Sequence, residues 1–384
     1  MIIEHLDLQN FRSYPKNDFN FSPSTTLIVG PNTAGKSNLI EAIFFLASGR
    51  SFRTDKDDQL VKFEKGIARI KGKVARLPAP EGEANGGQED KVLEAMIVKG
   101  GEEGQLRSFK KYLVNGVVKR KADFVGNFFA VLFAPNDLEI IIGSPSRRRD
   151  FLDNILIQTD REYRLAIGFY EKGLRIRNAL LHKAKETGRR SEKEFIYWDN
   201  LLVVQGQKIT KKREAFIEYL NNSKKHILDF KIFYDKSIIS KERLLQYQDA
   251  EVASGVTLVG PHRDDFYIRI NPNKINANEY EYDVKNFGSR GQQRLAVLQL
   301  KILELNYIEQ TTQNKPTLLL DDIFSELDEG HINLVLDQTL LRPDFAKATT
   351  GKQGYGGQAI MTTTHEEFIP KKLLKGINVI ELGK

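Results

Sequence analysis

The sequence predicts an α/β fold that is interrupted by an inserted helical domain. A strand, a glycine-rich loop and a helix follow one another within the first 50 residues, and an apolar strand ending in two carboxylates lies at 316–322. Residues from about 150 to 245 instead show the apolar period of long helices. The two ends of the chain therefore form one body, 1–145 with 256–384, and 146–255 is the predicted insertion.

The first 145 residues are expected to be rich in strands. Residues 1–30 contain two short strands, the second ending at TTLIVG, and a helix is expected from about 37 to 47. Three further strands are predicted at 68–77, 91–100 and 108–116, where Asn115-Gly116 is typical of a hairpin turn. The polar, Pro/Gly-rich stretch at 78–90 is predicted to be a surface loop.

The insertion is predicted to be an antiparallel pair of long helices joined at GRRSEKE, residues 188–194. Apolar residues recur at helical spacing on each: Leu165, Phe169, Ile176 and Leu180 on the first, then Trp198, Leu202, Ile209, Phe216 and Leu220 on the second. Trp198 is expected in the core between them. After Gly255 we expect strands at VTLVG and DFYIRI, a helix at 287–309, the strand PTLLLDD, a helix, a glycine-rich loop near 348–357 and a last strand, AIMTTT.

Composition and charge bound the function. The 384 residues contain no cysteine and no apolar run long enough to cross a bilayer, so we expect a cytoplasmic protein without disulfides. Residues 146–255 hold 23 Lys and Arg against 16 Asp and Glu, so the formal surplus of +7 lies in the insertion. Such a segment suits a polyanion such as nucleic acid, or it is a solvated helical face.

GPNTAGKS fits the pattern G-x-x-x-x-G-K-[ST], with a strand before it and a helix after it. Its residues are Gly30, Pro31, Asn32, Thr33, Ala34, Gly35, Lys36 and Ser37. In such a loop the backbone N–H groups point toward phosphate oxygens, the lysine supplies a positive charge and the serine hydroxyl binds Mg²⁺. Thr33 stands where related loops often have glycine.

TLLLDDIFSELD, residues 317–328, places two carboxylates at the end of an apolar strand. Ligands bind at this end of open α/β sheets. We expect Asp321 to hold, with Ser37, the Mg²⁺ of a bound nucleotide, and Asp322 to orient or activate water beside the γ-phosphate. Asp322 and Lys36 are the predicted catalytic residues.

FGSRGQQR, residues 287–294, opens a second apolar helix on glycine and serine. Ser289, Gly291 and Gln292 are predicted to form a second phosphate site, because a helix N-terminus offers N–H donors and a positive dipole end. One nucleotide needs one such cradle per chain, so two chains paired head to tail would share each triphosphate. An N-cap is the alternative, and it explains Ser289 but not the linked Gln292, Gln293 and Arg294.

These motifs resemble a known family. FGSRGQQR resembles the signature motif of ABC-type ATPases, and SELD, 325–328, resembles their D-loop. NFRSY (10–14), SFRT (51–54), FAPNDLEIIIGSPSRRRDFLD (133–153), LRIRNALL (174–181) and GPHRDDF (260–266) are similar, in order and over nearly the whole chain, to the RecF family of bacterial DNA replication and repair proteins.

The resemblance implies an ABC-type P-loop ATPase head with a mixed sheet and an antiparallel strand subdomain, plus a helical arm domain in place of the long coiled coil of SMC proteins. It implies ATP and Mg²⁺ as cofactors, an ATP-dependent homodimer, and binding to double-stranded, gapped or junction DNA together with RecO and RecR. Since Asp322 replaces the usual glutamate and is one methylene shorter, slow, DNA-stimulated hydrolysis is expected. Two other classes compete: the ATPase subunit of a membrane transporter, and an ATPase fused to a nuclease.

Several residues keep two interpretations. Arg12 matches the arginine of the family's N-terminal motif and either contacts nucleotide or forms a structural salt bridge. Asn136 stands where the family has an acidic residue, so it is a weak candidate for sensing Mg²⁺, and His365 is not assigned to the γ-phosphate.

Basic side chains of the insertion, and His262 after it, also have two interpretations each. Arg147 to Arg149 contact phosphates or pair with Asp150 and Asp153. Residues 211–213 are expected on a solvated helix face, with DNA contact as the alternative. His262 is expected in a buried polar network, with a metal site as the alternative.

Overall fold

The computed structural model describes residues 1–75, 90–100, 108–271, 282–323, 357–365, 367 and 377–383. The chain divides into two compact units, which we call the terminal unit (1–136 and 304–384) and the central unit (137–303). The central unit is larger than the predicted arm of 146–255, because 256–303 groups with the helices. That 256–303 functions as part of an ATPase head, together with 1–145, stays a prediction.

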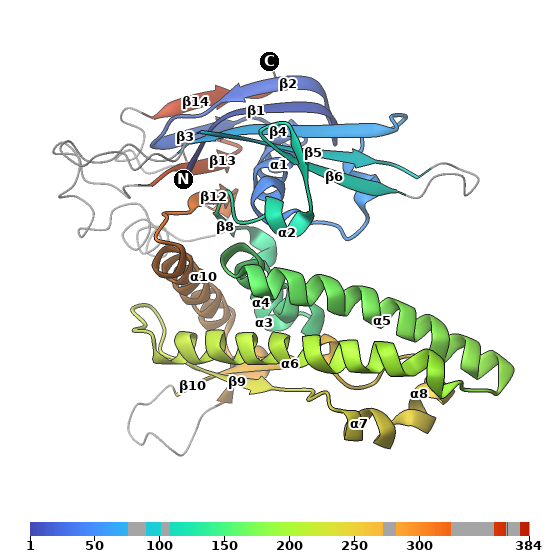
Figure 1. The fold of residues 1–384 in the computed structure, drawn as a ribbon. Coiled ribbons are helices and arrows are strands. Elements are labelled where there is room, and N and C mark those ends of the chain that lie inside the picture. Colours follow the sequence, from blue (N-terminus) through green and yellow to red (C-terminus); the bar gives the residue numbers. More distant parts are fainter. Residues whose placement is uncertain are drawn as a thin grey trace. The chain divides into compact units, whose positions relative to one another are not determined.

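The terminal unit contains a five-stranded parallel sheet in the order β14-β3-β13-β12-β8 (Figure 1). Its strands are β3 (Thr25–Val29), β8 (Ala130–Phe133), β12 (Thr317–Asp321), β13 (Ala359–Thr363) and β14 (Asn378–Glu381). β8, β12 and β13 are buried along their whole length, as expected for parallel strands covered on both faces. Helix α1 (Lys36–Ser48) follows β3 and is buried from Leu39 to Ser48.

A six-stranded antiparallel sheet completes the terminal unit, in the order β2-β1-β4-β5-β6-β7. It comprises β1 (Ile2–Phe11), β2 (Tyr14–Asn20), β4 (Ile67–Ala75), β5 (Lys91–Val98), β6 (Phe109–Val114) and β7 (Val117–Lys119). The predicted hairpin is confirmed, since Asn115 and Gly116 both have positive φ, 50° and 77°, between β6 and β7. Three short helices accompany the strands: η1 (Asp57–Leu60) precedes β4, α2 (Lys121–Phe124) lies between β7 and β8, and η2 (Pro135–Leu138) follows β8.

The central unit is mainly helical. Its helices are α3 (Glu139–Ile142), α4 (Pro145–Thr159), α5 (Arg161–Thr187), α6 (Glu192–Asn222), α7 (Lys241–Gln246), α8 (Gln248–Ser254), η3 (Pro261–Arg263), α9 (Val284–Phe287) and the first half of α10 (Arg290–Thr312). A three-stranded antiparallel sheet, β11-β10-β9, comprises β9 (Lys231–Asp235), β10 (Asp265–Ile270) and β11 (Tyr282–Asp283). The long pair α5 and α6 confirms the predicted helical hairpin (Figure 1).

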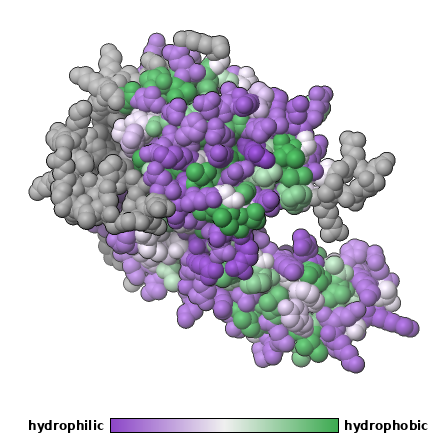
Figure 2. All heavy atoms as spheres, turned by 45° about the horizontal axis from the view of Figure 1, so that its top comes forward, coloured by the Kyte–Doolittle hydropathy of each residue, from purple (hydrophilic) through white to green (hydrophobic). Residues whose placement is uncertain are grey.

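The buried face of α5 differs from the predicted one. It carries Tyr163, Ala166, Tyr170, Gly173, Arg177, Leu181 and Ala184. Phe169, predicted on the apolar face, is 50% exposed, and Trp198 of α6 is only half-buried. Small residues such as Gly173 let α6 approach closely, and a buried arginine takes a place that hydrophobicity alone would give to leucine. Apolar side chains therefore remain exposed among hydrophilic ones on this hairpin (Figure 2).

VTLVG, 256–260, is not a strand, contrary to prediction. Its N–H groups bond to side chains instead of a neighbouring strand: Thr257 N–H donates to Asn178 Oδ1 at 2.9 Å, and Leu258 N–H donates to Glu251 Oε1 at 2.8 Å. An apolar, β-branched stretch is thus held as a loop by carbonyl and carboxylate acceptors on α5 and α8.

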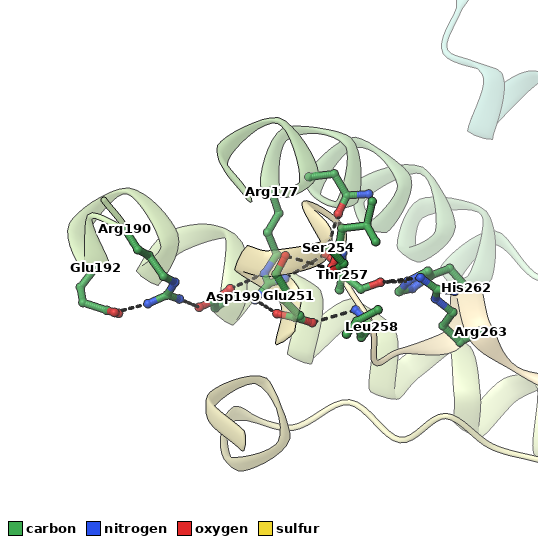
Figure 3. A network of polar contacts seen from close by, with 12 residues as sticks. Arg177, Arg190, Glu192, Asp199, Glu251, Ser254, Thr257, Leu258, His262 and Arg263 are labelled. Atoms are coloured by element: carbon green, nitrogen blue, oxygen red, sulfur yellow. Dashed lines mark hydrogen bonds and ion pairs between the residues drawn. The ribbon is translucent and has the colours of Figure 1, made fainter. Parts of the chain in front are cut away.

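Two buried arginines organise the central unit. The first is Arg177, which pairs with Asp199 of α6 at 2.6 Å and Glu251 of α8 at 2.7 Å and donates to Thr257 (Figure 3). Because buried charges are stable only when paired and hydrogen-bonded, this cluster fixes how α5, α6 and α8 pack.

The second is Arg213, which is 2% exposed and bonds Asp153 of α4 at 2.8 Å and Asp264 at 3.0 Å. The prediction of a solvated face at 211–213 is therefore wrong for this residue. It shares the helix phase of Ile209 and Phe216, both fully buried, and it finds two carboxylates there.

Candidate functional site

The predicted phosphate loop joins the end of β3 to α1. Gly35 precedes the helix with φ 100°, and no side chain caps the helix start, so the N–H groups of the first turn have no side-chain acceptor from a cap. The loop needs both of its glycines: a Cβ on Gly30 would lie 2.6 Å from the Leu382 carbonyl oxygen, and one on Gly35 would lie 2.8 Å from the Tyr14 hydroxyl. Thr33 has φ 74°, a left-handed conformation that strains a β-branched residue.

The ammonium group of Lys36 lies within this loop. Its Nζ donates to the carbonyl oxygens of Gly30 at 2.7 Å and Pro31 at 3.0 Å. Burial lowers the pKa of Lys36, while the charges of Asp322 and Asp321 oppose that change. The loop therefore holds one positive charge close to two carboxylates from β12.

The end of β12 meets the start of α1, as predicted. Ser37 Oγ donates to Asp321 Oδ1 at 3.0 Å, and Thr362 of β13 donates to the same oxygen at 2.8 Å. Burial raises the pKa of Asp321, and the two hydroxyl donors oppose this by favouring the carboxylate. Hydroxyl and carboxylate oxygens at this spacing are the ligand types that Mg²⁺ prefers, so the donor set fits that ion.

Asp322 follows directly and is held in a strained conformation. Its φ is 51°, and its backbone N–H donates to Thr362 Oγ1 at 3.0 Å. Thr362 thus positions both carboxylates. Thr362 was not predicted from the sequence, although its place at the carboxyl end of the strand beside β12 indicates a site residue.

Arg12 forms the structural salt bridge that was one of its two interpretations. Its Nε and Nη2 donate to both carboxylate oxygens of Glu41 at 2.8 and 2.6 Å. Glu41 is fully buried in α1 and also accepts from Ser51, while Arg53 Nη1 lies 3.7 Å from it. Two of the resembling motifs, NFRSY and SFRT, therefore converge on one buried carboxylate behind the loop. Glu41 was not predicted, since nothing in the apolar run around it indicates a partner.

The helix start at FGSRGQQR lies in the central unit and carries a reciprocal cap. Gln292 N–H donates to Ser289 Oγ at 3.2 Å, and Ser289 N–H donates to Gln292 Oε1 at 2.9 Å. Gln293 Nε2 donates to the Val284 and Lys285 carbonyl oxygens at 3.2 Å each. Local structure therefore explains both glutamines, which the sequence reasoning had taken as evidence against a simple cap.

Gly291 has a different status from its neighbour Gly288. A Cβ on Gly288 would lie 2.5 Å from the Val284 carbonyl oxygen, so the fold requires a glycine there. The nearest atom to a Cβ on Gly291 would be Ser289 Oγ at 3.9 Å, and Gly291 is exposed. The packing of this chain therefore leaves Gly291 free to carry a side chain, and a bare backbone faces outward at this point.

The arginines at 147–149 were expected to contact phosphates or to form salt bridges. Arg148 pairs with Asp265, its Nη2 donating to Oδ2 at 2.9 Å, and Arg149 donates to the Asp264 carbonyl oxygen. Burial lowers the pKa of Arg149, and the charges of the predicted Asp153 and Asp150 oppose that change.

His262 lies in the expected polar network, with Nδ1 2.8 Å from the Tyr170 hydroxyl. Asn136 is exposed in η2, and the His365 backbone oxygen accepts from Thr363 Oγ1. The SELD motif, the 78–90 loop apart from Asp90, and most of the 348–357 loop lie outside the described residues.

Two negative findings hold for the described part of the chain. It contains no cluster of three or more His, Cys, Asp or Glu side chains arranged to bind a metal ion. None of its helices has the length and apolar character needed to cross a membrane.

Comparisons with known proteins agree on one family. The family model described as RecF/RecN/SMC N terminal domain matches residues 2–348. DNA replication and repair protein RecF of Lachnoclostridium phytofermentans is 34% identical over 97% of this chain and 96% of its own length, and that of Caldanaerobacter subterraneus is 35% identical over 88% and 91%. A solved structure of the recombination mediator protein RecF with ATP, of the RecFOR pathway, is 32% identical with a TM-score of 0.79, covering 99% of this chain and 95% of that one.

The match extends over the loop, both carboxylates and the capped helix start, and nothing in it supports the transporter alternative. The nucleotide-binding and catalytic roles of the individual residues stay predictions. The strand–loop–helix geometry, the paired carboxylates and these near full-length matches establish that the chain belongs to the RecF family of DNA replication and repair proteins.

Proposed function

We propose that the chain is an ATP-switched DNA-binding protein in which two protomers close head to tail around shared nucleotide. The observation that carries this proposal is the exposed backbone at Ser289 and Gly291. Glycine in a helical first turn lowers helix stability relative to alanine, and packing within the chain does not require it here. The close approach of a group from outside the chain, such as a triphosphate, would explain why residue 291 is glycine.

In this proposal the loop of one protomer binds the triphosphate and FGSRGQQR of the other covers it. Residues 30–37, apart from Pro31, supply backbone N–H groups, and Lys36 moves its ammonium group from the Gly30 and Pro31 carbonyl oxygens to phosphate oxygens. The second set of donors is the Ser289 hydroxyl and the Gly291 N–H of the partner protomer, since the Ser289 N–H is already bonded to Gln292 Oε1. Arg12 acts behind the loop by fixing α1 through Glu41.

Ser37 and Asp321 would hold Mg²⁺, which offsets phosphate charge when bound. Thr362 keeps Asp321 oriented and holds the backbone of Asp322. In this proposal Asp322 is the group that orients or activates the water nucleophile. Its short side chain and strained backbone are consistent with slow, DNA-stimulated hydrolysis. Loss of the γ-phosphate contacts then lets the pair open.

The solved relative bound to ATP and the family's role in DNA replication and repair support the choice of ligand and of DNA as partner. We propose that the closed pair clamps double-stranded, gapped or junction DNA mainly through backbone phosphates and helps load recombinase with RecO and RecR. The net charge of +7 favours a polyanionic partner.

Replacing Ser289 tests the shared site. Ser289→Arg should leave ATP binding intact and abolish ATP-dependent dimers in sedimentation velocity, because a long cation at the helix start blocks the approach of the partner's nucleotide. ATP binding is measured separately with a fluorescent analogue. Persistent ATP-dependent dimers in this variant would refute the shared-site proposal.

Ser289→Ala is the matched comparison, because it loses the same cap without adding bulk. Both variants should lose about 1 kcal/mol of helix stability, as judged by chemical denaturation. Dimers should be weakened in the alanine variant but absent in the arginine variant, so equal behaviour of the two would point to the cap alone.

A further inference from the structure

One face of the β9–β10 hairpin in the central unit carries paired aromatic rings among cations. Phe233 of β9 and Tyr267 of β10 are directly opposite in the register, so their side chains leave the same face of the sheet. Their rings are nearly parallel, at 6° with centroids 5.3 Å apart, and Tyr267 is 37% exposed. The opposite face, with Ile232, Phe266 and Ile268, is buried.

Two cations flank these rings. Arg269 Cζ lies 4.9 Å from the Phe233 ring centre and 5.1 Å from that of Tyr267, and Lys231 Nζ lies 5.5 Å from Phe233. Lys231 and Arg269 are a register pair, so both stand one step along the same face. Neither makes an ion pair within the described ranges of the chain, so their charge is available to an anion.

A cavity of about 330 Å³ lies along β10, and Tyr267 is the one residue of the ring pair that lines it. Its other lining residues are Arg148, Asp265, Asp283, Lys285 and Asn286, with Ile140, Ile141, Phe266 and Ile268 as the apolar part. Arg148 is 6% exposed and holds the Asp265 carboxylate in place through two hydrogen bonds. Lys285 donates to the Gly143 carbonyl oxygen at 3.0 Å. The cavity therefore combines Tyr267 of the ring pair with apolar side chains and two carboxylates, of which Asp265 is held by Arg148.

We propose that this cavity binds an unstacked base of single-stranded DNA, with the strand's phosphates on Lys231 and Arg269. Single strands bind where an aromatic ring offers a stacking face beside cations that follow the backbone, and this face has both. The volume lies at the small end for ligand pockets, which suits one base. The Asp265 carboxylate can accept from the amino group of a base, as carboxylates do from cytosine.

This inference rests on the proposed DNA-binding function and extends it to the single-stranded part of a gapped or junction substrate. Duplex recognition through phosphates would leave the paired bases out of reach of Tyr267. A gap supplies bases that are already unstacked, so binding one requires little further unstacking energy.

Binding of a fluorescein-labelled single-stranded oligonucleotide to the full chain, measured by anisotropy, tests the pocket. Tyr267→Ala should raise the Kd about tenfold or more, since the loss of one base–aromatic stack corresponds to roughly that change in affinity. Tyr267→Phe keeps the ring and should bind as the wild type does. Tyr197→Ala removes a 64% exposed ring elsewhere and is the matched control. Wild-type affinity in Tyr267→Ala would overturn the proposal.

The cation arm of the proposal has its own measurement. Lys231→Gln removes one charge at an exposed position. The slope of log affinity against log salt should decrease by about 0.7, the value for one phosphate contact on a single strand. An unchanged slope would remove Lys231 from the strand's path.

Photocrosslinking locates the base without any variant. An oligonucleotide with 5-iododeoxyuridine should crosslink to Tyr267 or Phe233 on irradiation, as identified by mass spectrometry. Crosslinks only outside 231–235 and 265–270, as expected if the pocket takes a partner protein's side chain, would overturn the assignment. Crosslinking by the RNA version alone would overturn the choice of DNA.

The same variants separate this inference from the proposed function. Tyr267→Ala should still form ATP-dependent dimers and bind duplex DNA. If Ser289→Arg abolishes dimers but Tyr267→Ala keeps full single-strand affinity, the pocket is rejected and the shared nucleotide site stands. If single-strand binding depends on Tyr267 while dimers never form with ATP, the shared nucleotide site is rejected and the pocket stands.

Discussion

Single side chains with two tasks recur at the candidate site. Ser289 caps α10 and also lies at the proposed second phosphate site, while Thr362 orients Asp321 through its hydroxyl donor and Asp322 through its acceptor. The sequence predicted the residue types that the structure brings together between the loop and β12, because a glycine loop, a lysine and strand-end carboxylates have few other uses. It did not predict Thr362 or Glu41, since their partners come from segments distant in the chain.

His262 gives a residue-scale prediction for pH. Burial lowers the pKa of His262 to about 4 from 6.5, and its ring lies 2.8 Å from the Tyr170 hydroxyl and 3.1 Å from the Thr257 carbonyl oxygen. As pH falls below 6.5 the unfolded chain gains a proton that the folded chain takes up only near 4. Stability is therefore present above pH 6.5 and lost between 6.5 and 4, by roughly 3 kcal/mol for this group.

The measurement is the free energy of unfolding in urea across pH 4 to 7.5 for the wild type and His262→Gln. The advantage of the wild type should shrink as pH falls, because the glutamine does not titrate. His182→Gln is the control, since His182 is 67% exposed and its replacement removes a histidine without touching the buried network. A pH-independent difference for His262→Gln would contradict the buried, neutral imidazole.

At the scale of elements, periodicity predicted which segments are helices and strands but not always which face is buried. α5 and α6 were found at the expected places, whereas the buried face of α5 runs through Gly173 and Arg177 rather than Phe169. Close approach at glycines and ion pairing by arginines decide this packing, and neither follows from apolar spacing. The loop at 256–260 fails as a strand for a related reason, because its hydrogen bonds go to side chains.

Two glycines in these helices give opposite predictions for one substitution. A Cβ on Gly206 of α6 would lie 2.6 Å from Ile239 Cγ2 and 3.1 Å from the Tyr170 ring, and Ile239 is buried. A Cβ on Gly168 of α5 would have no atom within 4 Å. Gly206→Ala should destabilise the protein by about 1–3 kcal/mol through overpacking, while Gly168→Ala should stabilise it by about 1 kcal/mol through helix propensity.

Thermal and urea unfolding of the two variants check this pair directly. Each variant serves as the other's control, because both exchange a helical glycine for alanine. Stabilisation by Gly206→Ala would mean that α6 does not approach the 239 and 261 segments as closely as described.

At the scale of the whole molecule, the family could be predicted from the order of motifs along nearly the full chain. The boundary of the helical part could not: the predicted insertion was 146–255, whereas the central unit is 137–303. The segment 256–303 completes the central unit through β10 and through Asp264, which pairs with Arg213. A boundary drawn from composition cannot include such long-range pairing.

Duplex affinity should depend on both ATP and salt. We expect tight binding with ATP that falls steeply from 50 to 200 mM salt, with a slope of about −0.9 for each phosphate contact in the clamp. Without ATP the pair opens and affinity should fall. Filter binding or anisotropy over a salt series measures both effects, and salt-independent affinity would contradict a clamp on the backbone.

The parallel sheet has β3, residues 25–29, between β13 and β14, residues 359–363 and 378–381. During synthesis on the ribosome, β3 is made long before β13 and β14 and must wait for both partners. The central unit, continuous from 137 to 303, has all its partners much earlier and is expected to fold first. Until β13 and β14 are made, residues 30–37 would lack the neighbouring strands that shape them, so this loop is expected to take its final form after the central unit.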